Sequence, residues 1–272
     1  MALFRTTLRR MQALAGREDR NRLILVKAVA VSGFGRRLRT NRGPYSVALH
    51  NRALSIAIFL DPIARTAEES VVRELVSSGG CVVDVGANVG TITLCAAKAV
   101  GPSGRVWAFE PNPRSFAALL DNLKINNVDN VLALQLAVGD RDEPVAMTDE
   151  RGDDQNRVEP AGDIEVSARR LDEILPPDIQ IELLKIDVEG FEFAVLKGAR
   201  RALRSTMVVQ FEFDENHLAS FGTQPKDLLE FLDSEGFDVK VRCGREFVPF
   251  LFEAGQGRLN LYAFSRKNAT SA

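Results

Sequence analysis

The sequence predicts an α/β domain built around a mostly parallel sheet. Short β-branched runs alternate with helical patterns along most of the 272 residues, which is typical of repeated strand–helix–strand units. A glycine-rich turn at residues 86–90 joins the first of these strands to the first helix. A chain of this length is also long enough to bury one large core.

The individual elements follow from these patterns in chain order. Residues 82–85 form the first strand, and Gly101-Pro102 ends the helix at 91–100 that follows it. Later helices are expected at 115–126, 195–204 and 225–235. The other six expected strands are 106–109, 131–136, 181–186, 207–213, 237–241 and 259–264.

Composition excludes several classes of protein. The chain is 45% hydrophobic and 26% charged with a net charge of −2, unlike disordered or collagen-like sequences. No run of about 18 apolar residues exists, which argues against a membrane-spanning helix. The three cysteines lie outside any CxxC pattern and there are two histidines, so structural zinc and a disulfide framework are not expected. A reducing, cytoplasmic location fits best.

Charge divides the chain into unequal parts. Residues 1–43 carry eleven basic and two acidic side chains, a balance of +9, which leaves −11 for the rest. We therefore expect a basic, helical N-terminal extension over 1–45, a main domain over 46–265 and a polar, flexible tail over 266–272. Three interpretations of the extension are open: a solvated segment, an amphipathic helix that contacts an anionic membrane surface or a partner, and an organelle-targeting peptide.

An acidic stretch interrupts the alternation at residues 141–165. It holds nine acidic side chains, three arginines and few apolar residues. A segment of this composition is expected to be an insertion loop, serving either as a substrate lid or as a solvated insert.

The turn after the first strand predicts a nucleotide-like ligand. Gly86 and Gly90 let the backbone approach a ligand at the carboxyl end of the strand. Neither a dinucleotide GxGxxG pattern nor a phosphate-binding GxxxxGK[ST] pattern is present. Asp84 would repel a pyrophosphate, so the turn favours S-adenosylmethionine, which has no phosphate and carries an ammonium, a sulfonium and a ribose. Glu110, 26 residues after Asp84 at the next strand end, is the expected partner of the ribose hydroxyls.

Several segments together resemble one known family. VVDVGANVGTITL, AFEPNP, LAVGD, LLKIDVEGFEFAVLKGA and VVQFEF are similar to the class I S-adenosylmethionine-dependent methyltransferases of the FkbM type, over roughly residues 65–265. The resemblance implies a Rossmann-like, seven-stranded, mostly parallel sheet with helices on both faces and the last strand antiparallel. It also implies O-methylation of a hydroxyl on a sugar, polyketide or similar small molecule.

The resemblance also implies cofactor-binding residues. Glu110 would hold the ribose, with Asn112 beside it, and Ala137 would pack near the adenine. Asp187 would end the fourth strand and face the cleft between cofactor and substrate. The methionine portion would lie against Asp84, Gly86, Asn88 and Gly90.

A hydroxyl acceptor needs a base near the carboxyl ends of the fourth and fifth strands. The candidates are Asp187, Glu189, Glu212 and His217. His217 is chemically the best base because its ordinary pKa is near neutral pH, although a lone histidine on a loop is often structural. Glu189 could instead anchor its turn through backbone amides. Asp187 and Glu212 could share Mg²⁺. Phe213 occupies the position expected for a second metal ligand beside Glu212, and although Asp214 or Asn216 could replace that ligand, a metal site is not favoured.

Two further groups of residues have alternative interpretations. Lys185 lies within an apolar strand and is expected to pair with a carboxylate rather than to act as an activated amine. Phe247, Phe250 and Phe252, in the loop before the last strand, either wall an acceptor pocket or simply pack in the core.

The leading functional hypothesis is an O-methyltransferase acting on a small molecule, a sugar or glycan, or a lipid-linked sugar. The alternatives are an N-methyltransferase for a small amine, attracted by the acidic loop, and an inactive cofactor-binding subunit. Nucleic acid is not expected as a partner because residues 44–272 are acidic and no Asn/Asp-Pro-Pro-Tyr motif occurs. Peripheral membrane contact through the N-terminus is a further hypothesis, and the oligomeric state is left open.

Overall fold

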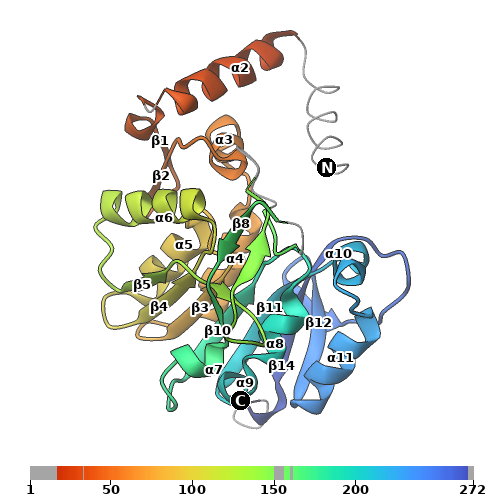
Figure 1. Ribbon diagram of the computed structural model, residues 1–272. Helices are drawn as coiled ribbons and strands as arrows, with labels where there is room; N and C mark the ends of the chain where they lie inside the picture. Colours follow the sequence, from red (N-terminus) through yellow and green to blue (C-terminus); the bar gives the residue numbers. More distant parts are fainter. Residues whose placement is uncertain (1–16, 33, 150–155, 160–161, 269–272) are drawn as a thin grey trace.

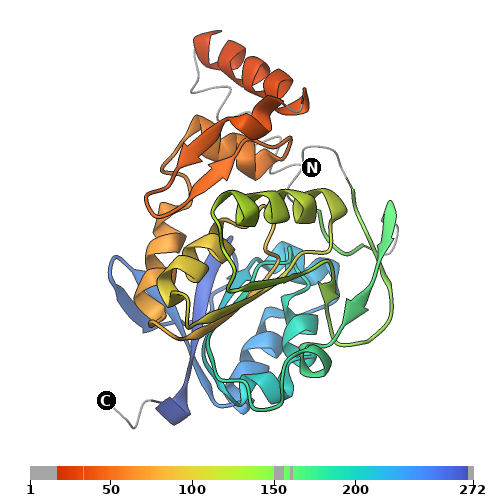
Figure 2. The ribbon, with the colours of Figure 1, turned by 90° about the vertical axis from the view of Figure 1, so that its left-hand side faces the viewer.

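The computed structural model describes residues 17–32, 34–149, 156–159 and 162–268. They form an α/β domain around one eight-stranded sheet, with a helical segment extending from one end (Figures 1 and 2). The strand order is β13-β12-β14-β11-β10-β3-β4-β5. Their bounds are β3 (Cys81–Val85), β4 (Arg105–Phe109), β5 (Val131–Leu134), β10 (Ile181–Ile186), β11 (Thr206–Phe213), β12 (Phe237–Cys243), β13 (Glu246–Pro249) and β14 (Leu259–Ser265).

All seven expected strands are present, and the last of them has the expected direction. Strands β5, β4, β3, β10 and β11 pair in parallel, whereas β14 runs antiparallel between β11 and β12. The eighth strand, β13, was not predicted and pairs with β12 as a hairpin. Phe247 therefore lies in a strand rather than in a loop, and its ring packs 5.0 Å from the rings of Tyr262 and Phe264.

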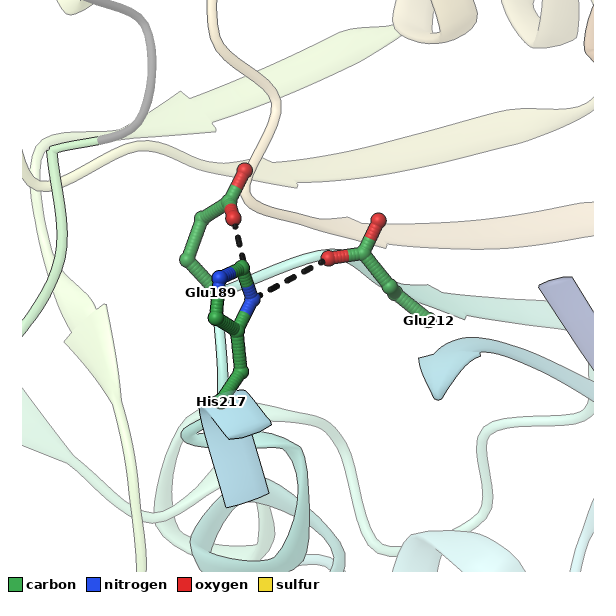
Figure 3. Close-up of side chains that lie close together, drawn as sticks. All are labelled: Glu189, Glu212 and His217. Carbon is green, nitrogen blue, oxygen red and sulfur yellow. Dashed lines mark ion pairs between the residues drawn. The ribbon is translucent and has the colours of Figure 1, made fainter. Parts of the chain in front are cut away.

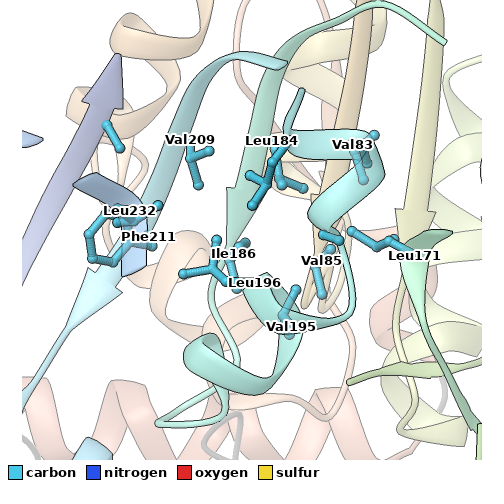
Figure 4. Packing of buried hydrophobic residues seen from close by; sticks show 14 of the residues in the cluster. Val83, Val85, Leu171, Leu184, Ile186, Val195, Leu196, Val209, Phe211 and Leu232 are labelled. Atoms are coloured by element: carbon cyan, nitrogen blue, oxygen red, sulfur yellow. The ribbon is translucent and has the colours of Figure 1, made fainter. Parts of the chain in front are cut away.

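Helices cover both faces of the sheet because successive strand residues point to opposite sides. The helices of the domain are α4 (Thr66–Leu75), α5 (Thr91–Val100), α6 (Pro113–Ile125), α7 (Leu171–Ile174), α8 (Glu192–Lys197), α9 (Arg200–Leu203), α10 (Glu215–Ser220), α11 (Pro225–Ser234) and η2 (Arg266–Asn268). Two short helices, α8 and α9, stand where one helix was expected at 195–204. Val82 and Leu183 belong to the core under α4, α5 and α6, while Val83 and Leu184 belong to the core under α8, α9 and α11 (Figure 4).

The N-terminal segment contains more than the expected helix. After α2 (Arg17–Val31) and η1 (Phe34–Arg37) comes a hairpin of β1 (Arg39–Asn41) and β2 (Ser46–Ala48), and then α3 (Ala53–Leu60). Helices α2 and α3 share a small apolar cluster. The hairpin is attached to α6, because Asn122 and Asn126 accept hydrogen bonds from the amides of Ala48 and Ser46 at 2.9 and 2.7 Å.

The stretch expected to be an acidic loop contains strands in its described part. Strands β7 (Val145–Met147) and β8 (Ile164–Val166) pair antiparallel, and beside them β6 (Ala137–Val138) pairs with β9 (Ala168–Arg169). The prediction of a loop without core residues was wrong here. Alternate apolar side chains of β7 and β8, such as Met147 and Val166, are buried against Ala137.

The fold includes no helix that could cross a bilayer. Among the described residues, no helix combines sufficient length with sufficient apolar character.

Candidate functional site

A cavity of about 380 Å³ lies at the carboxyl ends of β3, β4 and β10. This is the edge of an open parallel sheet where ligands bind. Gly86, Glu110 and Asp187 line it from the strand ends. Helix α3 and part of α2 form one wall, and the segment 156–158 together with Met147 forms another. The N-terminal segment and the β7–β8 arm therefore both shape the site.

The turn after β3 brings the backbone close to the neighbouring strand. The amides of Gly86 and Ala87 both donate to the carbonyl of Phe109, at 2.9 and 3.0 Å. Gly86 has φ +82°, and a Cβ there would lie 1.9 Å from the carbonyl oxygen of Asp187. Only glycine fits at this position.

Glu110 is placed as a ribose-binding carboxylate would need to be. It lines the cavity, and its oxygens accept the amides of Asn88 at 2.8 Å and Asn112 at 2.9 Å. Burial raises the pKa of Glu110 to about 7, although these two backbone amides act in the opposite direction. Beside it, the buried Asn88 Oδ1 has no hydrogen-bond partner among the described atoms and is available to a ligand. These groups fit the hydroxyls and ammonium of S-adenosylmethionine.

Three of the expected cofactor-binding residues lie behind the cavity wall. The cavity lining of the described chain includes none of Asp84, Gly90 and Asn112. Asp84 is fully buried and accepts a 2.6 Å hydrogen bond from Thr93 Oγ1. Asn112 accepts the amides of the first turn of α6 and so acts as its N-cap. Gly90 packs against Leu119 of α6, because a Cβ at Gly90 would lie 2.4 Å from the Cδ1 atom of Leu119. Ala137 does line the cavity, as expected.

Strand β10 ends in a buried chain of ion pairs. Lys185 Nζ lies 3.4 Å from Asp84 Oδ1 and 3.4 Å from Asp187 Oδ2. Burial lowers the pKa of Lys185, but the two carboxylates outweigh it and the pKa is raised. Burial likewise opposes ionisation of Asp187, yet Lys185 and Arg65 lower its pKa to about 2. Lys185 is therefore a paired cation, as expected, and Asp187 is too weak a base to take a hydroxyl proton.

The other three base candidates, Glu189, Glu212 and His217, form one cluster (Figure 3). Arg258 contacts two of them. His217 Nδ1 lies 3.3 Å from Glu189 Oε2 and 3.8 Å from Glu212 Oε2. Arg258 Nη2 lies 3.2 Å from Glu189 Oε1, and Arg258 Nε pairs with Glu212. Of the three candidates, only Glu189 lines the cavity, so the other two stand behind it.

The environment adjusts the proton affinity of this cluster. Burial raises the pKa of Glu189 to about 7, and the negative charges of Glu212 and Asp187 add to the effect. The pKa of His217 is also raised, first by its interaction with Glu212 and then by Glu189, against the effect of burial. A cavity-facing carboxylate with a near-neutral pKa is suited to general base catalysis.

The turn that carries Glu189 is shaped by its neighbours. Glu189 has φ +55°, and Gly190 has φ +110°. Glu192 anchors the turn, since its Oε1 accepts the amides of Val188 at 3.2 Å and Gly190 at 3.1 Å. The anchoring role considered for Glu189 therefore belongs to Glu192, which leaves the Glu189 carboxylate directed at the cavity and His217.

Replacing Gly190 with alanine tests how this turn packs on α10. A Cβ at Gly190 would lie 2.6 Å from the carbonyl oxygen of His217. At Gly236, which also has a positive φ of +91°, a Cβ would meet no described atom within 4 Å. We expect Gly190→Ala to lower the free energy of unfolding by about 1–3 kcal/mol more than Gly236→Ala, measured by urea denaturation. Equal losses would mean that only backbone strain matters.

Four arginines that line the cavity were missed by the sequence reasoning. Arg52 and Arg65 come from the N-terminal segment, Arg157 from the segment 156–158 and Arg258 from the loop before β14. Arg65 Nη1 lies 3.4 Å from Asp187 Oδ2. Its loop is held by the buried Arg42, which donates to the carbonyls of Pro62 and Ala64. No local motif marks these arginines, because each reaches the site only through the tertiary fold.

The arrangement of this cluster also indicates whether it could bind a metal ion. Glu189, Glu212 and His217 offer ligand atoms within 4.8 Å of one another. However, the Arg258 guanidinium already contacts both carboxylates, so the cluster has its own cation. Asp187, which was considered as a ligand together with Glu212, is paired with Lys185 and Arg65. These residues fit an arginine-neutralised cluster better than a Mg²⁺ site.

Comparison with known proteins agrees with this geometry. The family described as the methyltransferase FkbM domain matches residues 84–239, more than half of the chain. The chain belongs to the FkbM methyltransferase family. It is therefore an S-adenosylmethionine-dependent methyltransferase, as the sequence predicted.

Individual relatives are distant. Methyltransferase 1 of Beauveria bassiana is 29% identical over 189 residues, 59% of this chain and 73% of that protein. The hexuronic acid methyltransferase AglP of Haloferax volcanii is 28% identical over 182 residues, 64% of this chain and 71% of that protein. The 2-O-methyltransferase NoeI of Sinorhizobium fredii is 24% identical over 175 residues, 56% and 71% of the two chains.

Proposed function

We propose that this FkbM-family enzyme methylates a hydroxyl group of a sugar, glycan or other small molecule, with Glu189 as the general base. The observation that carries the proposal is the Glu189 carboxylate, which faces the cavity with a pKa raised to about 7 and is backed by His217. An inactive cofactor-binding subunit would have no need for such a cluster.

Different residues of the chain would bind the cofactor and accept the proton. Bound S-adenosylmethionine supplies an electrophilic methyl group. Glu110 and Asn88 would bind its polar groups at the end of β3 and β4. Glu189 would accept the proton of the acceptor hydroxyl on its carboxylate as the oxygen attacks, and His217 and Arg258 would hold that carboxylate in place. Because Arg258 already balances the cluster, we expect turnover without added Mg²⁺.

A hydroxylated acceptor is favoured over an amine by the base rather than by the charge of the cavity. Three of the lining residues are acidic and six are basic, but Lys185 and Arg258 are paired with Asp84 and Glu212 behind the cavity wall. A hydroxyl needs a general base to remove its proton, and the Glu189 carboxylate with its raised pKa supplies one. The names of two relatives, a hexuronic acid methyltransferase and a 2-O-methyltransferase, also support a hydroxylated sugar as the acceptor class. The six basic residues are Lys27, Arg52, Arg65, Arg157, Lys185 and Arg258.

Cofactor binding is the first test. Titration calorimetry with S-adenosylmethionine and its demethylated product should show binding to the wild type. Glu110→Gln should weaken it by about 10- to 100-fold, because a hydrogen bond to a charged group contributes about 1.5–3 kcal/mol. The exposed Glu230→Gln on α11 is the control and should bind like the wild type. Undiminished binding by Glu110→Gln would remove Glu110 from the cofactor site.

An acceptor screen then tests the reaction class. The enzyme with isotopically labelled S-adenosylmethionine is offered neutral sugars, uronic acids and their amino-sugar counterparts, with and without Mg²⁺. We expect label on hydroxyl oxygens of the first two groups only. Label on the nitrogen of amino sugars, or turnover only with Mg²⁺, would contradict the proposal.

The pH dependence of kcat/KM follows from the base. Glu189 can accept a proton only when it is ionised, and burial has raised its pKa to about 7. The rate should therefore rise as the pH rises through about 7 and level off above it. A rate that stays constant down to about pH 5 would indicate a carboxylate with an ordinary pKa as the base instead.

A further inference from the structure

The C-terminal part of helix α2, residues 23–31, is apolar on both of its sides. Of residues 23–31, all but Lys27 are apolar. Val26 and Ala30 are buried in the cluster shared with α3. Ile24, Leu25 and Val31 point the other way and are 64%, 65% and 67% exposed. A helix that is apolar all round normally lies buried, so this outer face is suited to contact with another apolar phase.

The net charge of the surrounding segment indicates which kind of apolar partner this face contacts. The segment 1–43 that contains α2 has a balance of +9, whereas the rest of the chain has −11. A second copy of the chain would bring two such basic segments together, which is unfavourable. Three exposed apolar side chains are also few for a protein interface, which needs about 800 Å² on each partner. Among the described residues, Lys27 of α2 and Arg36 and Arg37 of the neighbouring η1 are exposed and basic. A segment that combines exposed apolar and basic side chains is what an anionic bilayer surface binds.

The same helix belongs to the wall of the cavity. Leu23 and Lys27 of α2 line it, and Ile24 and Leu25 follow in the same turns but face outward. Figure 1 shows α2 at the outer end of the molecule, beyond α3, where none of the other described helices and strands covers its outer face. A surface bound to α2 would thus lie beside the cavity.

We infer that the outer face of α2, formed by Ile24, Leu25 and Val31, docks on an anionic lipid bilayer. The apolar side chains would enter the interfacial region while exposed basic side chains such as Lys27 and Arg36 contact lipid phosphates. This places the cavity beside the membrane surface, where a lipid-linked sugar would present its hydroxyls. That second consequence rests on the proposed function, whereas the docking does not.

Vesicle co-sedimentation of the full chain tests the docking. One set of vesicles is phosphatidylcholine, and the other is an equal mixture of phosphatidylcholine and phosphatidylglycerol. The wild type should sediment with the mixed vesicles, and more weakly as salt is added. Ile24→Glu/Leu25→Glu should bind at least about tenfold more weakly, because two apolar side chains leave the interface and two negative charges enter it.

The matched control is Leu132→Glu/Met207→Glu, which places the same charges on two exposed apolar side chains of the main sheet. It should sediment like the wild type. The inference is overturned if the wild type prefers neither vesicle, if both double variants lose binding equally, or if Ile24→Glu/Leu25→Glu instead converts a dimer into a monomer by mass measurement. Calorimetric affinity for S-adenosylmethionine, which should be equal in all three proteins, separates loss of docking from failure of the proposed enzyme.

Discussion

Replacing Glu189 with glutamine should lower kcat for methyl transfer by about 10²- to 10⁴-fold, the usual contribution of a general base. Glutamine keeps the shape of the side chain but cannot accept the hydroxyl proton. The affinity for S-adenosylmethionine should change little, because Glu110 and Asn88 at the other strand ends carry the cofactor contacts. The rates are measured with the acceptor that the screen identifies, and the affinity by calorimetry.

A substitution of His217, which lies next to Glu189, distinguishes the residue that acts as the base from the residue that positions it. His217→Asn should lower the rate less than Glu189→Gln and shift the rising limb of the pH profile to higher pH. The charge of His217 lowers the pKa of Glu189, so loss of the histidine leaves that pKa higher, while Arg258 still favours the ionised carboxylate. Glu173→Gln, an exposed acidic side chain on α7, serves as the control and should leave the rate unchanged. If Glu189→Gln retains a near wild-type rate, another group takes the proton and the assignment of Glu189 is wrong.

Replacing Asp84 with asparagine should destabilise the fold by about 3 kcal/mol, the cost of leaving a buried charge without one of its partners. Asp84 is fully buried, lies opposite Lys185 in the sheet register, and has its Oδ1 3.4 Å from Lys185 Nζ. Asparagine preserves the size of the side chain but removes the negative charge. Urea denaturation measures the loss of unfolding free energy.

A double-mutant cycle shows whether the ion pair is responsible. Adding Lys185→Met to Asp84→Asn removes the unbalanced charge and should restore part of the stability. The affinity of folded Asp84→Asn for S-adenosylmethionine should fall less than that of Glu110→Gln, since Asp84 does not line the cavity and Glu110 does. A larger loss of affinity for Asp84→Asn would return Asp84 to the cofactor site that the family resemblance implied.

Much of this protein is determined by short stretches of its sequence. The seven strands and the glycine turn at 86–90 were predictable because β-branched runs, turn residues and apolar periodicity are local properties. Glu110 follows β4 directly and Glu189 lies three residues after the end of β10, so their place at the carboxyl edge of the sheet follows from chain order alone. The family also follows from local motifs, which is why the FkbM domain match at residues 84–239 agrees with the prediction.

Only the tertiary structure decided which side chains share the site. Asp84 and Asp187 are close to the same turn, yet one is buried against Lys185 and the other lines the cavity, because the direction of each side chain depends on packing between strands. Arg65 and Arg258 lie far from every motif and reach the carboxylates only when the chain folds. Burial and pairing of charges depend on such long-range contacts, and these in turn set the pKa of Glu189 and hence its suitability as a base.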